Sequence, residues 1–222
     1  MTIVLYGAGG ATIVDVEESC RRLGLEIAAI VRNIDTPDRA LSLARVVDVD
    51  ALDPATRALP FLVPIFTPGH RFVARRDAMA RGFATPATVV DPTAIVAASA
   101  RIGGGSYVNA GVVIAGAASI GTWVFVNRAA SLGHHTELAD FASVGPGAVI
   151  CGETRLGRGA TVGAGAVVLP GVEIGANSTI AAGSVVRSSI PGHCLAAGLP
   201  ARIVRRGYPG FGDLSVGQDV GG

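Results

Sequence analysis

The sequence has little charge, few aromatic residues and few cysteines. Of its 222 residues only 16% are charged and 5% aromatic, and 18 Lys and Arg nearly balance 17 Asp and Glu, leaving a formal net charge of +1. Without excess positive charge there is no electrostatic basis for a nucleic acid or an anionic membrane as partner. The cysteines, Cys20, Cys151 and Cys194, lie far apart and form no CxxC pair. This spacing argues against a disulfide framework or zinc site and favours a reducing cytoplasm.

Despite a mean hydropathy of +0.50, the chain has no run suited to a transmembrane helix. The uncharged stretch 102–127 is interrupted by six glycines and by Asn109. The N-terminus has no basic segment, and acidic residues from Asp15 onward fall where the apolar part of a signal peptide would continue. We therefore expect a cytoplasmic protein that binds neither membranes nor nucleic acid.

Residues 1–84 alternate between strand and helix patterns. A short apolar strand at 2–6 runs into Gly-Ala-Gly-Gly, a helix extends to about Leu23 before Gly24, and a second strand covers 26–31. This order predicts a βαβ unit at the start of a parallel sheet.

The rest of this region is less regular. Residues 61–66 resemble a strand that Pro64 confines to an edge or irregular position. Residues 68–81 indicate a helix closed by Gly82. The pattern gives no definite assignment for 35–60.

From residue 90 onward an aliphatic residue recurs at every sixth position. All seventeen of these positions hold Val, Ile or Leu, although those types make up only 58 of 222 residues. They are Val90, Val96, Ile102, Val108, Ile114, Ile120, Val126, Leu132, Leu138, Val144, Ile150, Leu156, Val162, Val168, Ile174, Ile180 and Val186. A period of six fits neither an α-helix nor an alternating strand.

The period instead predicts a parallel β-helix of triangular cross-section. Each hexapeptide gives one short strand and one corner, the aliphatic side chain points inward, and three hexapeptides, 18 residues, close one coil. Coils stack at the strand spacing of ~4.8 Å. Because the phase never slips, we expect a single prism without inserted loops.

Four segments resemble one family. They are Ile-Val-Leu-Tyr-Gly-Ala-Gly-Gly at 3–10, Arg-Asp-Ala-Met-Ala-Arg-Gly-Phe at 76–83, the mid-prism residues 127–140, and Ala-Gly-Leu-Pro-Ala-Arg-Ile-Val at 197–204. They are similar to the bacterial hexapeptide-repeat sugar acyltransferases. That group includes nucleotide-sugar N-acetyltransferases of bacillosamine and perosamine pathways and enzymes described as sialic acid O-acetyltransferases.

The resemblance implies an architecture in three parts. An α/β N-terminal domain, a Rossmann-like βαβ unit, would occupy 1–84 and bind a nucleotide sugar. A left-handed parallel β-helix would follow over 85–187 as the acyltransferase domain. Residues 188–222 would form a C-terminal extension and Gly-rich tail. The implied activity is acetyl transfer from acetyl-CoA to the amino group of a nucleotide-linked 4-amino-6-deoxy sugar in surface glycan biosynthesis.

Two adjacent histidines, His134 and His135, fall at a corner of the prism, where side chains point outward. Imidazole titrates near neutral pH and suits a base that takes a proton from an attacking amine or hydroxyl. The resemblance implies that His134 is this base, that Asn127 contacts the reacting groups, and that the Gly152 N–H donates to the oxyanion. From the residues alone, a solvated histidine pair and a corner-capping asparagine remain open.

The residue after the base departs from the family pattern. Relatives commonly carry an acidic residue there, where this chain has His135, which we place in the catalytic site. Asp140, Glu137 or a backbone carbonyl would then orient His134, or the acceptor would differ from the best-known amino sugars.

For the donor, the resemblance implies a groove along the prism between neighbouring subunits, and hence a homotrimer. Ser143 stands where some relatives carry a second histidine that contacts acetyl-CoA, and Gly152 lies beside the thioester. Arg202 and Arg205 would meet the CoA phosphates, although a solvated basic end is an alternative.

For the acceptor, the glycine turn Gly7-Ala8-Gly9-Gly10 suits a phosphate at a helix N-terminus. The resemblance implies that this turn, with Arg32 and Asn33 after the second strand, holds the nucleotide sugar. Relatives usually continue the turn with His-Gly and follow the second strand with acidic residues. The nucleotide therefore stays open, and tight packing is a second explanation for the glycines.

Other functions fit less well. An O-acetyltransferase acting on a sugar hydroxyl, such as sialic acid, and a non-catalytic trimeric nucleotide-sugar-binding scaffold both stay open. A metal-dependent hydratase on the same prism needs three converging histidines, and the coils offer only an adjacent pair, so we expect no metal.

Overall fold

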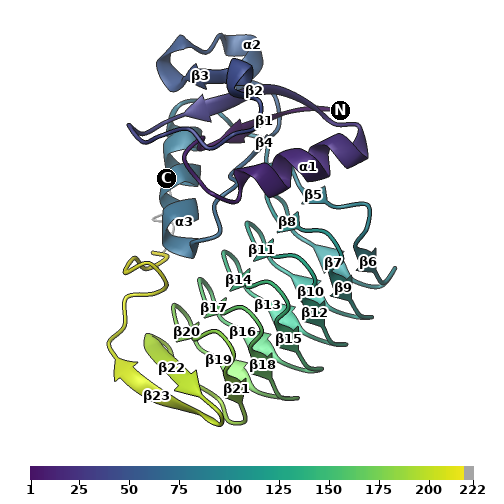
Figure 1. The fold of residues 1–222 in the computed structure, drawn as a ribbon, viewed down its shortest axis with the longest axis vertical. Coiled ribbons are helices and arrows are strands. Elements are labelled where there is room, and N and C mark those ends of the chain that lie inside the picture. Colours follow the sequence, from purple (N-terminus) through teal and green to yellow (C-terminus); the bar gives the residue numbers. More distant parts are fainter. Residues whose placement is uncertain (218–222) are drawn as a thin grey trace.

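The computed structural model describes residues 1–217, and it places an α/β layer over the first coils of one face of a three-sided β-helix (Figure 1). The seventeen strands β5–β21 form the prism, and the hairpin β22–β23 lies at its far end. None of the helices in this part of the chain has the length and apolar character needed to span a bilayer.

The N-terminal layer is a parallel sheet in the order β3-β2-β1-β4. Its strands are β1 (Thr2–Tyr6), β2 (Glu26–Arg32), β3 (Val46–Asp48) and β4 (Phe61–Leu62). The helix α1 (Ile13–Leu23) connects β1 to β2, so the predicted βαβ unit is present. It ends at Gly24, whose φ of 66° is a left-handed conformation that glycine adopts without strain.

The unassigned region between β2 and β4 contains short elements. These are the 3₁₀ turns η1 (Leu43–Arg45) and η2 (Val49–Ala51), strand β3, and the short helix α2 (Pro54–Arg57). The predicted strand at 61–66 is wrong beyond Leu62. Carbonyl groups at Pro64 and the two residues after it accept hydrogen bonds from side chains rather than from a neighbouring strand. The helix α3 (Pro68–Ala80) closely matches the predicted one.

The prism consists of two-residue strands, and each of the seventeen predicted aliphatic residues is the second residue of one of them. The strands are β5 (Val89–Val90), β6 (Ile95–Val96), β7 (Arg101–Ile102), β8 (Tyr107–Val108), β9 (Val113–Ile114), β10 (Ser119–Ile120), β11 (Phe125–Val126), β12 (Ser131–Leu132), β13 (Glu137–Leu138), β14 (Ser143–Val144), β15 (Val149–Ile150), β16 (Arg155–Leu156), β17 (Thr161–Val162), β18 (Val167–Val168), β19 (Glu173–Ile174), β20 (Thr179–Ile180) and β21 (Val185–Val186).

The register confirms a coil of 18 residues. Every strand pairs in parallel with the strand three along, as when Ile120 faces Leu138 and Val126 faces Val144. Stacking the coils in this way gives three sheets, and the aliphatic side chains together with small residues fill the interior. Burying these side chains removes apolar surface from water, which is the main stabilisation available to so narrow a prism.

From Gly105 to Gly183 every corner also has a left-handed residue, three positions after the aliphatic one. Glycine takes this position at Gly147 and Gly165, but the same conformation occurs at Trp123, His135 and Phe141, with φ near 55–60°. Bulky residues rarely adopt positive φ. The stacked coils impose it here, because each corner must repeat the turn of the coil beside it.

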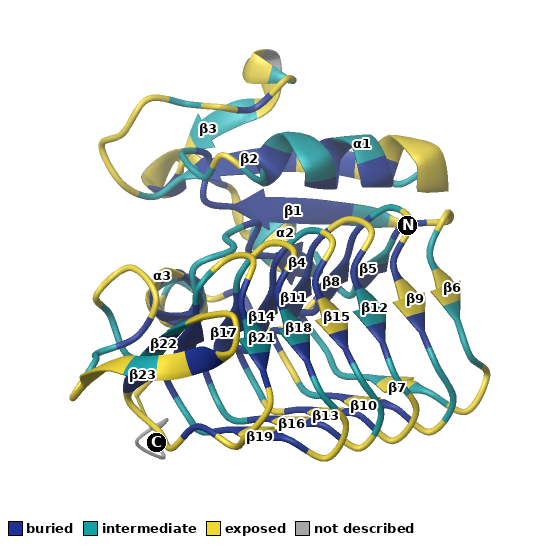
Figure 2. Ribbon diagram, turned by 60° about the horizontal axis from the view of Figure 1, so that its bottom comes forward, coloured by how far each residue is buried: buried dark blue, intermediate teal, exposed yellow. Residues whose placement is uncertain are grey.

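The three faces of the prism differ on the outside. The covered face is the sheet that contains β5, β8, β11 and β14. Its residues Tyr107 and Phe125 pack against the N-terminal layer. The charged face presents Arg155, which pairs with Glu137 and Glu173. The apolar face, formed by β6, β9, β12, β15, β18 and β21, presents its outward residues in one column, and several of these are exposed in Figure 2.

A buried arginine joins the N-terminal layer to the prism. Arg71 on α3 donates hydrogen bonds to the carbonyls of residues 65, 66, 123, 141 and 142 and to the Ser143 hydroxyl. Burial lowers the pKa of this guanidinium to about 9. Around it, the rings of Trp123 and Phe141 stack between α3 and β4, so that the two parts share one apolar core.

A buried carboxylate ties α1 to the first coil. Asp91 is 1% exposed, and it accepts hydrogen bonds from Arg22 Nε at 2.9 Å, Ser19 Oγ at 2.6 Å and Thr93 N at 2.9 Å. Burial raises the pKa of the Asp91 carboxyl, but these hydrogen bonds outweigh it and hold the pKa well below its usual range.

We expect Asp91→Asn to lower the free energy of unfolding by about 2–4 kcal/mol at neutral pH. Because the folded-state pKa lies below the unfolded one, this contribution is complete above pH ~4 and is lost as pH falls through the folded-state value. Urea unfolding near pH 7 and near pH 2.5 should therefore show a smaller difference between wild type and variant at the acid pH. Equal differences at both pH values would contradict the assignment.

Candidate active site

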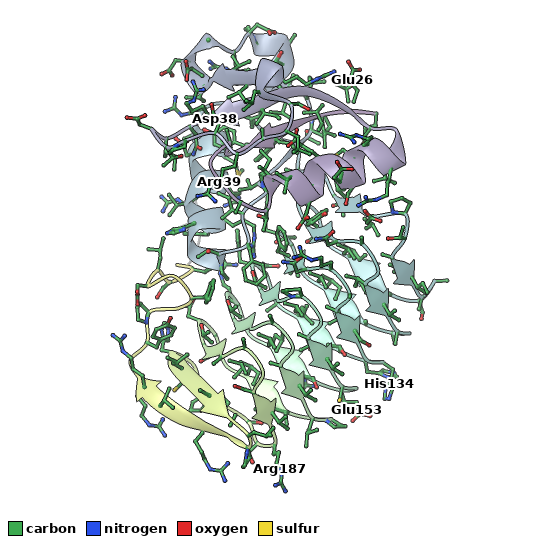
Figure 3. The ribbon with its side chains drawn as sticks, viewed as in Figure 1. Glu26, Asp38, Arg39, His134, Glu153 and Arg187 are labelled. Carbon is green, nitrogen blue, oxygen red and sulfur yellow. The ribbon has the colours of Figure 1, made fainter. Side chains whose placement is uncertain are left out.

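The two histidines lie at the corner that follows β12, on the edge of the prism (Figure 3). Both are exposed, as their corner position predicts. Their rings meet edge to face with 5.3 Å between centroids, and the Nδ1 atoms of His134 and His135 are 3.1 Å apart. Directly along the stack, Glu153 N donates to the His134 carbonyl at 2.9 Å, which fixes the backbone of the corner.

The ring partner of His134 is His135. A base that acts through Nε2 must carry its proton on Nδ1, and the His135 Nδ1 is then the acceptor of that N–H. The alternatives expected from the sequence are engaged elsewhere. Asp140 accepts from Thr122 N at 2.8 Å, and Glu137 pairs with an arginine on the charged face.

Gly152 lies against the flat side of the His134 ring, one coil along. A Cβ at this position would lie 2.7 Å from both Cε1 and Nε2 of His134, so only glycine leaves room for the imidazole. The equivalent corner N–H is capped by a side chain at Ala110 and Arg128. Within residues 1–217 the Gly152 N–H has no such acceptor, which leaves a donor free beside the His134 ring.

Asn127 lies at the other edge of the apolar face, at the corner before β12. It is 7% exposed, and its Oδ1 accepts from Arg128 N at 2.8 Å and from Asn109 Nδ2 at 2.9 Å. Asn109 is held in turn by Ala110 N and by Asp15 of α1. With the oxygen committed to these donors, the Asn127 amide N–H groups are oriented away from them.

The structure contradicts the prediction that Ser143 contacts acetyl-CoA. Its side chain is fully buried on the covered face, where it donates to the Phe66 carbonyl at 2.6 Å and accepts from Arg71. An outward position on a prism face is accessible only where nothing packs over it, and here the N-terminal layer does.

The predicted phosphate contacts, Arg202 and Arg205, are exposed on β23 (Ala201–Arg206), which pairs with β22 (Cys194–Gly198). Arg205 stacks on Tyr208 at 5.4 Å. Neither guanidinium pairs with a carboxylate among the described residues. In its sheet β23 lies four strands beyond β14, the next strand of that sheet after the His134 corner, which is roughly 19 Å along the prism.

A cavity of about 290 Å³ opens beside the glycine turn, between the N-termini of α1 and α3. Gly7, Gly9, Gly10 and Asn33, four of the residues predicted to bind the acceptor, line it. The N–H groups of Gly9 and Gly10 meet no acceptor within the described residues, so they are available to an anion. Ala8 is buried and does not line the cavity.

The same glycines also pack closely, so both explanations offered by the sequence apply. Gly7 has a φ of 117°, and a Cβ on Gly9 would lie 2.2 Å from Thr36 Oγ1. Arg32 is different: it pairs with Asp38 and, at 2.8 Å, with Asp48. Arg32 borders a second, more open cavity and does not line the one beside the glycine turn.

Sequence reasoning missed several side chains of the first cavity. Ile65 and Val73 line it, and His70 does so from the first turn of α3. Leu214 reaches it from the tail. The proximity of the Thr-Pro-Gly-His segment at 67–70 to a strand end was a usable signal for His70, whereas nothing in the tail sequence points to Leu214. Among the described residues no group of three metal-binding side chains is found.

Comparisons with known proteins show which proteins share this fold. A model of the bacterial transferase hexapeptide family (six repeats) matches residues 153–188. A comparison with curated protein sequences gives no match. Perosamine N-acetyltransferase from Caulobacter crescentus, solved as a histidine variant in complex with CoA and GDP-perosamine, is 33% identical with a TM-score of 0.76, over 91% of this chain and 95% of that one.

Two further structures agree. The acetyltransferase domain of PglB from Neisseria gonorrhoeae, in complex with acetyl coenzyme A, is 30% identical with a TM-score of 0.79, over 91% of this chain and 98% of that one. WeeI from Acinetobacter baumannii, at 19% identity, a TM-score of 0.75 and coverage of 92% and 100%, shows the shared fold. The first two likenesses extend over nearly the whole of each relative. The chain therefore belongs to the bacterial hexapeptide-repeat sugar acyltransferases.

Proposed function

We propose that this protein transfers an acetyl group from acetyl-CoA to the amino group of a nucleotide-linked 4-amino-6-deoxy sugar. The observation that carries the proposal is the His134 corner, where an exposed imidazole lies against Gly152 beside a free N–H. The relatives bound to CoA and GDP-perosamine, or to acetyl coenzyme A, support the same donor and a nucleotide-sugar acceptor.

The geometry suits acyl transfer. As the acceptor nitrogen attacks the thioester carbonyl and the C–N bond forms, His134 Nε2 takes the proton from that nitrogen. The carbonyl oxygen becomes an oxyanion and accepts a hydrogen bond from the Gly152 N–H. When the C–S bond breaks, the departing thiolate of CoA takes the proton from His134. His135 holds the His134 ring in the tautomer that this sequence of steps needs.

A trimer would complete the site, and the apolar face supports it. Its outward column includes Ile95, Val113 and Val149, which are 67%, 41% and 39% exposed, whereas the other two faces are covered or charged. Asn127 and His134 border opposite edges of this face. Packing three copies around an axis brings one edge of a copy against the other edge of its neighbour, and so brings Asn127 of one copy to His134 of the next.

The remaining assignments follow from this arrangement. Donor phosphates would meet Arg202 and Arg205 at the far end of the prism. The pyrophosphate of the acceptor would lie at the glycine turn, within a Rossmann-like, nucleotide-sugar-binding layer of residues 1–84, ahead of a left-handed prism over 85–187. The free thiols of Cys20, Cys151 and Cys194 fit a reducing cytoplasm.

The direct test is thiol release from acetyl-CoA by the purified protein with UDP-, dTDP- and GDP-linked 4-amino-6-deoxy sugars and with free sialic acid. We expect turnover with one of the amino sugars. Turnover only with sialic acid would show an O-acetyltransferase, and nucleotide-sugar binding without thiol release would show a scaffold. Either result would overturn the proposal.

A further inference from the structure

After β23 the chain stays packed against the protein and runs from the far end of the prism to α3 (Figure 1). This segment, residues 208–217, is called the tail here. It begins where Tyr208 N donates to the His193 carbonyl at 2.7 Å. Midway, the Phe211 ring meets Phe66 edge to face with centroids 5.8 Å apart. The tail therefore spans the prism and the N-terminal layer.

The tail is anchored by specific bonds. Val216 N donates to Asn177 Oδ1 at 2.8 Å, and Asn177 Nδ2 donates back to the Val216 carbonyl at 3.3 Å. The Val216 side chain is 4% exposed and belongs to the core that contains Phe72 and Phe141. These two hydrogen bonds and the buried Val216 side chain hold the residues that precede Val216, including Leu214, in place.

Those residues place Leu214 on the first turn of α3. A Cβ on Gly69 would lie 2.4 Å from the Leu214 carbonyl oxygen and 2.7 Å from its Cγ. Only a glycine at position 69 lets the tail approach this closely. The sequence thus has a matched pair, a glycine in the helix and a leucine in the tail.

From this position Leu214 forms one wall of the cavity beside the glycine turn. Ile34, Ile65 and Val73 also line this cavity and are aliphatic too. Asn33 and His70 add polar groups to the lining. A mainly aliphatic lining with a few polar groups suits a flat heteroaromatic ring, and the free N–H groups of the glycine turn suit the phosphates attached to it.

We propose that Leu214 of the tail is a specificity-determining residue that contacts the base of the nucleotide-linked acceptor. This inference rests on the proposed function, because it identifies the cavity as the nucleotide site. It assigns to the tail a role in binding as well as in packing.

The test is calorimetric binding of GDP, UDP, dTDP and acetyl-CoA to the full chain and to Leu214→Ala. We expect the variant to lose about 5- to 20-fold in affinity for the nucleotide that wild type prefers, as a lost aliphatic wall would cause. The ratio of the GDP and UDP affinities should change as well, because the enlarged cavity discriminates less by size. Acetyl-CoA affinity should stay within about twofold, since no part of this cavity lies on the prism corner.

Two further variants test whether the effect depends on the position of Leu214. Leu23→Ala removes a leucine from the opposite end of α1 and should leave all of these affinities unchanged. Gly69→Ala leaves the sequence of the tail unchanged but displaces Leu214, because the added Cβ would clash with it. It should reproduce the loss of nucleotide affinity. If wild type binds a nucleotide and Leu214→Ala binds it equally well, or loses acetyl-CoA affinity in parallel, the inference is wrong while the proposed function stands. If wild type binds none of GDP, UDP and dTDP, both are overturned.

Discussion

Replacing His134 by alanine is expected to lower kcat for acetyl transfer by about 10²–10⁴-fold while leaving acetyl-CoA affinity nearly unchanged. The imidazole lies at an exposed corner with its ring against Gly152, so it contributes little to the packing of the prism. Its removal takes away the base but leaves the Gly152 N–H in place. The loss should therefore appear in the chemical step and not in binding.

Thiol release at saturating donor and acceptor measures kcat, and titration with acetyl-CoA measures donor affinity. The matched control is His193→Asn, which removes an exposed histidine from a corner with the same left-handed backbone, at φ 55°, which asparagine tolerates. It should keep the wild-type rate. A His134→Ala enzyme with near-normal kcat would remove His134 from the reaction.

The prism could be predicted almost completely from the sequence, because its geometry forces a pattern on the chain. Inward side chains recur every sixth residue, and any slip would expose them, so the period alone located all seventeen strands. The corner position of His134 followed from the same phase. The left-handed conformation of the corner residues from Gly105 to Gly183 did not follow from the sequence, since Trp123 and Phe141 occupy positions where glycine would be expected.

Those two aromatics show what a repeat cannot reveal. A face of the prism becomes buried only when another part of the chain packs over it, and the repeat treats the three faces alike. The resemblance assigned Ser143 to the donor site, and nothing in the repeat shows that Arg71 and Phe66 enclose it. Large aromatic residues in outward or corner positions were the available signal that one face is covered.

The cavity beside the glycine turn was predicted in part. The glycine turn was visible because a strand, glycines and a helix follow one another directly in sequence. Arg32 was predicted to bind the nucleotide sugar together with the glycine turn, but it does not line this cavity. Its pairing with Asp38 and Asp48 depends on a loop that had no clear pattern. Leu214 lies 134 residues beyond the end of α3 at Ala80, and no local sequence pattern encodes a contact over that separation.

A second large effect is expected from mixing two inactive variants. Asn127 and His134 border opposite edges of the apolar face, and we propose that the active site joins Asn127 of one copy to His134 of the next. Asn127→Ala and His134→Ala should each be nearly inactive alone. In a trimer containing both kinds of chain, one of the three interfaces receives the intact Asn127 and the intact His134.

The measurement that tests this account most directly is the acetyl-transfer rate of the two variants after co-refolding at equal concentrations. Random mixing puts both variants in about three quarters of the trimers, so the rate should recover to about one quarter of wild type. Adding Val149→Arg to both chains places a charge on the apolar face and should abolish the recovery. Recovery near one quarter that is lost with Val149→Arg is the predicted result. No recovery, when each variant alone is folded and trimeric, would contradict a site shared between copies.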